Sequence, residues 1–479
     1  SQFMKTILPF LMLISIAAAS AFAQTTYDRH VLFDNSPTND SDESSNSYLV
    51  APSTLETLRD AMPVETAHFV SPPNALRLHW KSAPGGDWRM TVQIKRRYAR
   101  KFHFEGDALT FWVYPDTEIT TENSPRLYLM DSHEKGTPSV TLVTGDKKIP
   151  AGKWTQVILP FAALHSPNYN GTDDSAYIVA DTLSVSLLQG LDDNLEHTVY
   201  LDDFQIRDAA PGDAIAPPAP ASTTVRAYER HFDVAWTASD TSDLLAYRIY
   251  RSTDDGKTFL PVGTQQAGRT RYVDFIGAPG KRAQYRVTAL DIAGNESTPS
   301  PVSDAATTRE LNDDELLSMV QEGCFRYYWE CAHPTAGLAP EVIPGDPNLL
   351  ATGGSGFGVM ALLVGTERQF VTRDEGAGRM LKIVRFLAKA DRFHGVWPHF
   401  LNGDTGKVIP FFGKYDNGGD LVETAFMMQG LLAARQYFSH DNATEREIRD
   451  TITRLWREVE WDWYRKTPDS DVRHCHWSP

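Results

Sequence analysis

The hydrophobic period of this chain changes once, near residue 310, and that change constrains the fold more than any other feature of the sequence. Ahead of it, apolar and polar residues alternate in short runs such as ALRLHW and TVYLDDFQIRD, separated by Gly, Pro, Asn and Asp. This alternation is typical of strands with one buried face. From LNDDELLSMVQEGCFRYYWECAH onward, apolar residues recur every three or four positions, which predicts helices. The sequence therefore predicts β-sandwich domains followed by an all-α domain.

The first predicted helix begins just after residue 311. Asn312 or Asp313 is suited to be its N-cap, and Glu315 falls in the first turn. Its apolar stripe consists of Leu316, Leu317, Val320, Cys324, Tyr327 and Tyr328. Further helices are predicted at GFGVMALLVGTERQF, EGAGRMLKIVRFLAKA, LVETAFMMQGLLAARQYF and TEREIRDTITRLWREVEWDWY, with a hairpin flap at the NGDTG turn.

Length and charge narrow the classes of function. A chain of 479 residues suggests roughly three domains of about 150 residues each. Its 62 acidic and 46 basic residues give a net charge of −16, and no basic block could follow a phosphate backbone. We therefore expect no nucleic-acid partner.

The first 23 residues resemble a secretory signal. Met4 and Lys5 precede the apolar run ILPFLMLISIAAA, and residues 21–23 form a small-x-small cleavage site that would leave Gln24 first. The run is shorter than the roughly 20 residues that a membrane span requires, and no cysteine follows Ala23 to carry a lipid. We expect export to the periplasm or the outside, with no membrane span after cleavage.

Three cysteines are too few and too scattered for a disulfide framework. Cys324 and Cys331 would lie about 10 Å apart along one helix, beyond disulfide reach. Cys475 stands between His474 and His476, but alternate residues of an extended segment point to opposite faces. We expect no metal site there.

Residues 24–210 have the strand spacing of a β-sandwich. The pattern GKWTQVILPF at 152–161 and the closing strand VYLDDFQI resemble the jelly-roll carbohydrate-binding modules attached to polysaccharide-degrading enzymes. Aromatic residues could stack on a sugar face or could instead fill the core. Both alternatives apply to Trp80, Trp88 and Trp112.

A proline-rich linker at 211–222 precedes a second β-domain. The linker has too few large apolar residues to pack a core. Residues 223–309 resemble a fibronectin type III domain through Trp236, the alternating YRIY segment and the strand from Tyr285 into an aspartate-glycine turn. Such a domain implies a spacer rather than a catalyst.

Three acids stand at the head of the helix LVETAFMMQGLLAARQYF. If that helix ran from Asp416, the spacing of Asp416, Asp420 and Glu423 would place their carboxylates on one face, about 6 to 10 Å from first to last. A capping box could account for Asp420 and Glu423, but it leaves Asp416 unexplained. A helix N-terminus lowers the pKa of a nearby carboxyl group, so Asp420 or Glu423 would activate or position water, and the proton donor would lie elsewhere.

Several long segments resemble the glycoamylase-like domain of glycoside hydrolase family 144. They are FRYYWE, ATGGSGFGVMAL, RFHGVWPHFLNGDTG, YDNGGDLVETAFMMQGLLAARQYF and HWSP. The resemblance implies an (α/α)6 toroid that hydrolyses β-1,2-glucan or its oligosaccharides with inversion and without a cofactor, with Asp416, Asp420 and Glu423 in the cleft. The candidates for substrate binding are Trp397, Phe412, Tyr415, His476 and Trp477, and the aromatic ones have packing alternatives.

Residues 310–479 are too few for a whole toroid. Twelve helices with their loops require well over about 250 residues, so these residues predict the N-terminal part of the domain. The proton donor would then follow Pro479, this chain alone would be inactive, and inner residues such as Met427 and Leu431 would be exposed. The alternative is a non-catalytic sugar-binding protein that acts through its jelly roll. The sequence leaves open endo or exo cleavage, the linkage and the oligomeric state.

Overall fold

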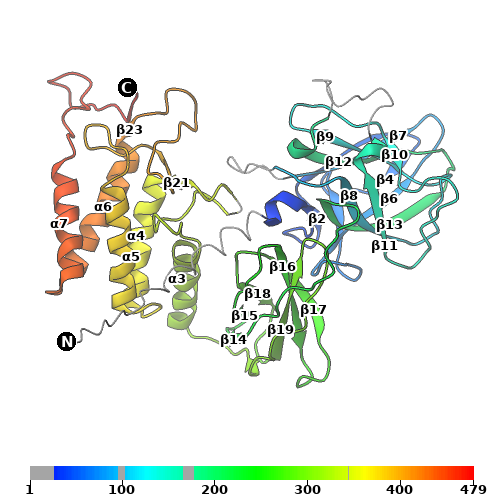
Figure 1. The fold of residues 1–479 in the computed structure, drawn as a ribbon, viewed down its shortest axis with the longest axis horizontal. Helices are drawn as coiled ribbons and strands as arrows, with labels where there is room; N and C mark the ends of the chain where they lie inside the picture. The colour runs from blue at the N-terminus through cyan, green and yellow to red at the C-terminus, as the bar shows by residue number, and fades with distance from the viewer. Residues whose placement is uncertain (1–25, 95–102, 165–176, 344) are drawn as a thin grey trace, which may run out of the picture. The chain divides into compact units, whose positions relative to one another are not determined.

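The computed structural model describes residues 26–94, 103–164, 177–343 and 345–479. The predicted signal at residues 1–23 lies outside the described residues. The chain divides into two compact units, one before and one after the boundary between Glu310 and Leu311 (Figure 1). No described helix has the length and apolar character to cross a membrane.

The first unit begins with a β-sandwich built from an eight-stranded and a five-stranded sheet. The larger sheet has the order β11-β8-β13-β6-β5-β2, with β1 paired to β13 and β4 paired to β6, and the smaller has the order β10-β9-β12-β7-β3. The strands are β1 (Val31–Phe33), β2 (Ser41–Asp42), β3 (Ser45–Val50), β4 (Thr54–Leu55), β5 (Met62–Glu65), β6 (Ala75–Lys81), β7 (Asp87–Gln93), β8 (Ala108–Pro115), β9 (Arg126–Asp131), β10 (Val140–Thr141), β11 (Thr155–Pro160), β12 (Thr182–Leu188) and β13 (Glu196–Arg207), with the short helices α2 (Phe161–Leu164) and η1 (Val179–Asp181).

Both sheets contribute alternate residues to one core, which decides between the two alternatives for the tryptophans. Trp80 on β6 and Trp88 on β7 meet inside it with ring centroids 5.5 Å apart, and neither is more than 1% exposed. They fill the core and offer no face to a sugar. Trp112 points the other way and remains partly exposed.

A second β-sandwich follows the linker in the same unit. It pairs a three-stranded sheet, β14-β15-β18, with a four-stranded sheet, β17-β16-β19-β20. Its core includes Trp236, Tyr247 and Tyr285. The strands are β14 (Thr223–Ala227), β15 (His231–Trp236), β16 (Leu244–Ser252), β17 (Leu260–Gln266), β18 (Arg271–Phe275), β19 (Arg282–Asp291) and β20 (Ala306–Thr307).

The second unit is helical, with short strand pairs at one end. Its elements are α3 (Asp313–Glu330), β21 (Leu349–Ala351), α4 (Thr352–Glu367), α5 (Arg373–Leu387), β22 (Phe400–Asn402), β23 (Gly419–Asp420), α6 (Leu421–Tyr437), α7 (Ala443–Arg457) and β24 (His476–Trp477). Strand β21 pairs with β22, and β23 pairs with β24. The coarse prediction, β-rich domains followed by helices, is confirmed.

Helices α4 and α6 touch through glycines, and this contact positions the candidate site. A Cβ atom added to Gly356 would lie 2.4 Å from the carbonyl oxygen of Phe426, and one added to Gly430 would lie 2.5 Å from the carbonyl oxygen of Gly356. Because only hydrogen fits, the two backbones pack directly on each other. Strands β21 and β23, which precede these helices, lie at the same end (Figure 1), so the heads of α4 and α6 are neighbours.

Local and long-range predictions about the helices had different outcomes. The N-cap of α3 is Asn312, one of the two residues predicted for it, and Glu315 in the first turn forms a capping box with it. The apolar stripe of α3 is largely solvent-exposed, with Leu317 50% and Val320 56% exposed, whereas Phe325 is buried.

The prediction that the inner helix residues Met427 and Leu431 are exposed is wrong. Both are fully buried, because α6 turns them into a core shared with α4, α5 and α7. Val422 and Phe426 are the large apolar residues of α6 that are exposed.

Candidate active site

Helix α6 begins at Leu421, five residues later than Asp416, and this separates the roles of the three acids. Asp420 is the N-cap, and its Oδ1 accepts hydrogen bonds from the amides of Val422 (2.9 Å) and Glu423 (3.0 Å). Asp416 lies in the preceding loop. Its Oδ2 accepts from the amides of Phe411 and Phe412, both at 3.1 Å. The expected single helical face is therefore wrong, and a loop holds Asp416.

The segment at the end of the chain binds the head of α6. In the β23–β24 pair, Gly419 lies opposite Trp477 and Asp420 opposite His476. A Cβ atom at Gly418 would lie 1.9 Å from the carbonyl oxygen of Trp477, so the approach requires glycine there. The His476 Nε2 lies 2.8 Å from the carbonyl oxygen of Tyr415. His476 and Trp477 thus border the loop that holds the acids.

Glu423 connects the heads of α4 and α6. Its Oε2 accepts a hydrogen bond of 2.7 Å from the amide of Gly353, in the first turn of α4. That amide is one of the donors that an α-helix leaves unpaired at its N-terminus, where a negative charge is also favourable. A Cβ atom at Gly353 would lie only 2.6 Å from the same oxygen. Asp420 is thus the N-cap, as in the capping-box alternative, but Glu423 binds α4 instead of reaching back to Asp420.

His399 completes this group, although the sequence analysis assigned it no role. It immediately precedes β22, and its carbonyl oxygen accepts from the amide of Thr352 at 2.9 Å. Its Nδ1 lies 3.3 Å from the Oδ2 of Asp420. The ring also packs edge-on against Phe412, with centroids 5.2 Å apart. The segment RFHGVWPHFLNGDTG contains this histidine, but its spacing does not connect it to Asp420.

The charges of His399 and Asp420 stabilise each other. Burial raises the pKa of Asp420, but the hydrogen bonds from His399 and from the α6 amides outweigh burial, and the net pKa is lowered. Burial lowers the pKa of His399, whereas the hydrogen bond to Asp420 and the negative charges of Glu423, Asp420 and Asp416 raise it. The raising effects are together larger than the effect of burial, so the net pKa is raised. Each group therefore favours the charged form of the other.

Glu341 is a second residue that the sequence analysis missed. Its amide donates to the carbonyl oxygen of Leu349 at 2.8 Å, which fixes it beside β21. Burial raises the pKa of Glu341. The charge of His399 lowers this pKa and the charge of Glu423 raises it, and the net pKa is raised. The pKa of Asp420 is therefore lowered while that of Glu341 is raised.

The candidate sugar contacts differ in exposure. Trp397 is fully buried, and its indole N–H donates to the carbonyl oxygen of Leu387 at 3.1 Å, so its ring has no face for a sugar. Phe412 and Tyr415 are each 68% exposed, on the loop that carries Asp416. Trp477 is partly exposed and packs edge-on against Trp463. This placement favours Phe412 and Tyr415 as stacking surfaces and removes Trp397.

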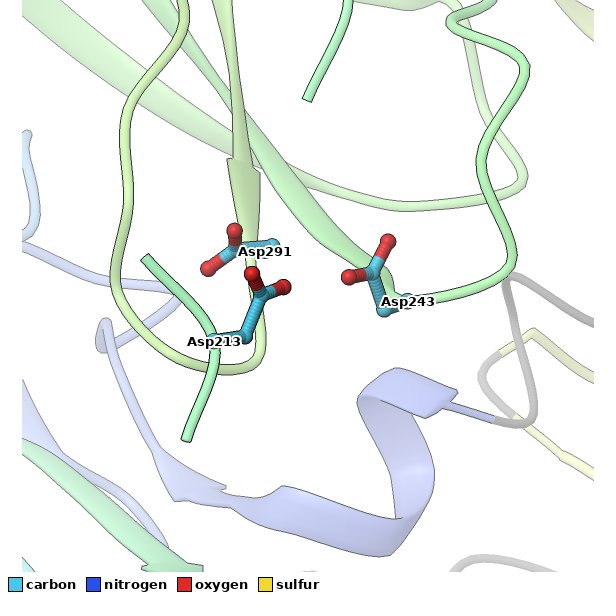
Figure 2. Close-up of side chains that lie close together, drawn as sticks. All are labelled: Asp213, Asp243 and Asp291. Atoms are coloured by element: carbon cyan, nitrogen blue, oxygen red, sulfur yellow. The ribbon is translucent and has the colours of Figure 1, made fainter. Parts of the chain in front are cut away.

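One group among the described residues has ligand atoms close enough for a metal, and it lies in the first unit. Asp213, Asp243 and Asp291 place one oxygen each within 4.8 Å of one another (Figure 2). The buried Asp291 accepts from both the backbone and side-chain amides of Asn295, and Asp243 accepts from the Thr241 hydroxyl. These donors hold the carboxylates of Asp291 and Asp243 in place.

Comparisons with known proteins give the site its context. No family model matches the chain. The chain is 41% identical over 469 residues to an exo β-1,2-glucooligosaccharide sophorohydrolase acting at the non-reducing end, from Parabacteroides distasonis. It is a homologue of that glycoside hydrolase. The alignment covers 98% of this chain and 64% of the relative.

This chain is also similar to a solved structure. The crystal structure of a β-1,2-glucanase from Parabacteroides distasonis matches with a TM-score of 0.85 at 41% identity, over 95% of this chain and 64% of that one. The chain thus spans 64% of the length of the proteins that it matches in these two comparisons.

Proposed function

We propose that this chain carries the N-terminal part of a glycoside hydrolase of family 144 that cleaves β-1,2-glucan or its oligosaccharides with inversion. The observation that carries the proposal is the cluster of Asp420, Glu423 and His399 at the joined heads of α4 and α6, in a chain 41% identical to a sophorohydrolase. Asp416 holds the neighbouring loop. Hydrolysis of a glycosidic bond needs one ionised and one protonated carboxyl group across the bond.

Glu423 is the better placed of the two helix-head acids to activate water. A carboxylate offers about four acceptor positions. Asp420 uses three of them, for Val422, Glu423 and His399. Glu423 uses one acceptor position, for the amide of Gly353, and therefore has more positions left for water. We propose that Glu423 accepts a proton from the attacking water and that Asp420 orients the site.

The raised pKa of Glu341 makes it a candidate to donate the proton. Because its pKa is raised while that of Asp420 is lowered, the two can differ in protonation at one pH. In an inverting reaction, water attacks the anomeric carbon as its bond to the glycosidic oxygen breaks. Glu423 takes a proton from the water, and the donor supplies one to the leaving oxygen. The alternative is a donor that follows Pro479, and the variant Glu341→Gln distinguishes the two.

The test uses the complete protein that contains this chain. Release of reducing ends from β-1,2-glucan and from β-1,2-glucooligosaccharides is measured for the wild type, Glu423→Gln and Asp420→Asn. The proposal expects hydrolysis of these substrates and loss of it in both variants, with retained binding. Wild-type rates in both variants would remove these residues from the mechanism, and product sizes would distinguish exo from endo cleavage.

We propose the architecture and location with the function. The inner helices α4 and α6 and the outer helices α3, α5 and α7 would belong to an (α/α)6 toroid, and the pairing of three with four strands supports a fibronectin type III spacer. We also propose export to the periplasm or the outside. N-terminal sequencing of the mature protein should then start at Gln24.

A second candidate function, sugar binding by the first sandwich, has an observation of its own. Tyr200 on β13 lies directly opposite Tyr114 on β8, and the rings of Trp154 and His68 extend the row, with neighbouring centroids 4.8 to 5.9 Å apart. Rings on a sheet face can stack on pyranose C–H groups. Affinity electrophoresis of the whole chain in glucan gels, with Trp154→Ala as the comparison, tests this function. Equal mobility of both proteins in every gel would contradict it.

A further inference from the structure

His399 makes three contacts that join separate parts of the candidate site. Its side chain meets the Asp420 carboxylate, its carbonyl oxygen meets the amide of Thr352 at the start of α4, and its ring meets the exposed Phe412. Helices α4 and α6 are thus both connected to this residue. A residue that only filled space would not need a donor aimed at the N-cap carboxylate.

The geometry divides the two oxygens of Asp420. Oδ1 takes the amides of Val422 and Glu423, and Oδ2 faces His399. The α6 amides alone would leave the carboxylate free to rotate Oδ2 toward other partners. With His399 in place, both oxygens of the carboxylate have partners, which holds its plane relative to the α6 amides.

We propose that His399 is a positioning residue of the hydrolase, which holds Asp420 ionised and oriented through a charged Nδ1–H···Oδ2 hydrogen bond. This inference rests on the proposed function. It assigns His399 no contact with the reacting atoms, since its action passes through Asp420.

The electrostatic surroundings favour the charged ring. The acids that face His399 are Asp420, Glu423 and Asp416, which raise its pKa, and Glu341, whose own pKa responds to the histidine. A charged donor binds a carboxylate more strongly than a neutral one. Because His399 lowers the pKa of Asp420, removing the imidazole should raise that pKa.

The kinetic test compares His399→Gln with the wild type in the complete protein. Glutamine can still donate to Asp420 but carries no charge. We expect kcat to fall by about 10-fold to 100-fold with little change in KM, since misplaced catalytic groups cost rates of this order. The acidic limb of the kcat/KM profile should move to higher pH. The matched control is His440→Gln, at a histidine whose side chain is 63% exposed between α6 and α7, and it should leave the profile unchanged.

A second measurement does not depend on activity. NMR titration of the His399 ring in the wild type should give a pKa above the ordinary value, and Asp420→Asn should lower it. An ordinary His399 pKa that Asp420→Asn does not change would overturn the inference, as would a wild-type profile in His399→Gln. Absence of hydrolysis by the wild type would instead contradict the proposed function, and the titration would still decide the role of His399.

Discussion

The first sandwich and the head of α6 both carry aromatic residues that could bind a sugar, but these residues differ in their exposure to solvent. Trp80 and Trp88 alternate into a core between two sheets, whereas Phe412 and Tyr415 are exposed on the loop that carries Asp416. Residue type is therefore a poor guide to a binding surface. What matters is whether the backbone position faces the partner sheet or a loop with polar neighbours.

The largest effect is expected at the acids at the head of α6. Glu423→Gln keeps the shape of the side chain but removes the base, and kcat should fall by about 1,000-fold, within the range for general base catalysis. Reducing-end assays measure this. A loss below tenfold would assign the water to another residue.

Trp80→Ala should have the largest effect in the sandwich, and on stability alone. Removing a fully buried tryptophan costs about 3 to 5 kcal/mol of unfolding free energy. Urea denaturation of the sandwich transition measures the loss. Weakened glucan binding with unchanged stability would show instead that Trp80 is a binding residue.

Glu341→Gln tests the raised pKa. If Glu341 donates the proton, activity is present while this group is protonated and falls as pH rises through its raised pKa. The variant should lose about 100-fold in kcat on substrates with poor leaving groups, and the basic limb of its pH profile should change. An unchanged basic limb would place the donor elsewhere, as the sequence analysis expected.

Gly353→Ala tests the contact between the two helix heads. The added Cβ would lie 2.6 Å from the Glu423 Oε2 and should displace that carboxylate, with a loss of about 10-fold to 100-fold in kcat. The adjacent Gly354→Ala is the matched control, because its Cβ would find only Ala351 at 3.6 Å. Equal activities of the two variants would contradict a role for this contact.

Tyr415→Ala should have the smallest effect. The ring is 68% exposed, so stability should hardly change, and the loss of one stacking contact of about 1 kcal/mol should raise KM about fivefold. Substrate-dependence curves measure this. An unchanged KM would leave Phe412 as the remaining exposed ring on this loop.

Short-range features of the site could be predicted from the sequence, and long-range ones could not. Both N-caps depend on residues within one turn: Asn312 was one of the two predicted for α3, and Asp420 was the alternative to a helix running from Asp416. The partner of Glu423 is Gly353, which lies on another helix, and no spacing rule connects them. His399 was missed for the same reason, since its partners Thr352 and Asp420 lie at the heads of two different helices.

The start of α6 shows a different limit. Periodicity marks the apolar run, but it does not show that the chain before Leu421 is extended, because β24 supplies that pairing from much later in the sequence. The expected helical face of Asp416, Asp420 and Glu423 failed at this point. Similarly, the alternation along its strand did not show whether Trp80 faces the core or the solvent, because that depends on where the partner sheet lies.

The pairing of β23 with β24 has a consequence for synthesis of the protein. Asp420 lies opposite His476, with all of α6 and α7 between them in the chain. The head of α6 therefore cannot reach its final form until the polypeptide has emerged past Trp477 and the α6–α7 pair has folded back. Contacts of such high sequence separation form late, so the acids acquire their working arrangement only after most of this unit has left the ribosome.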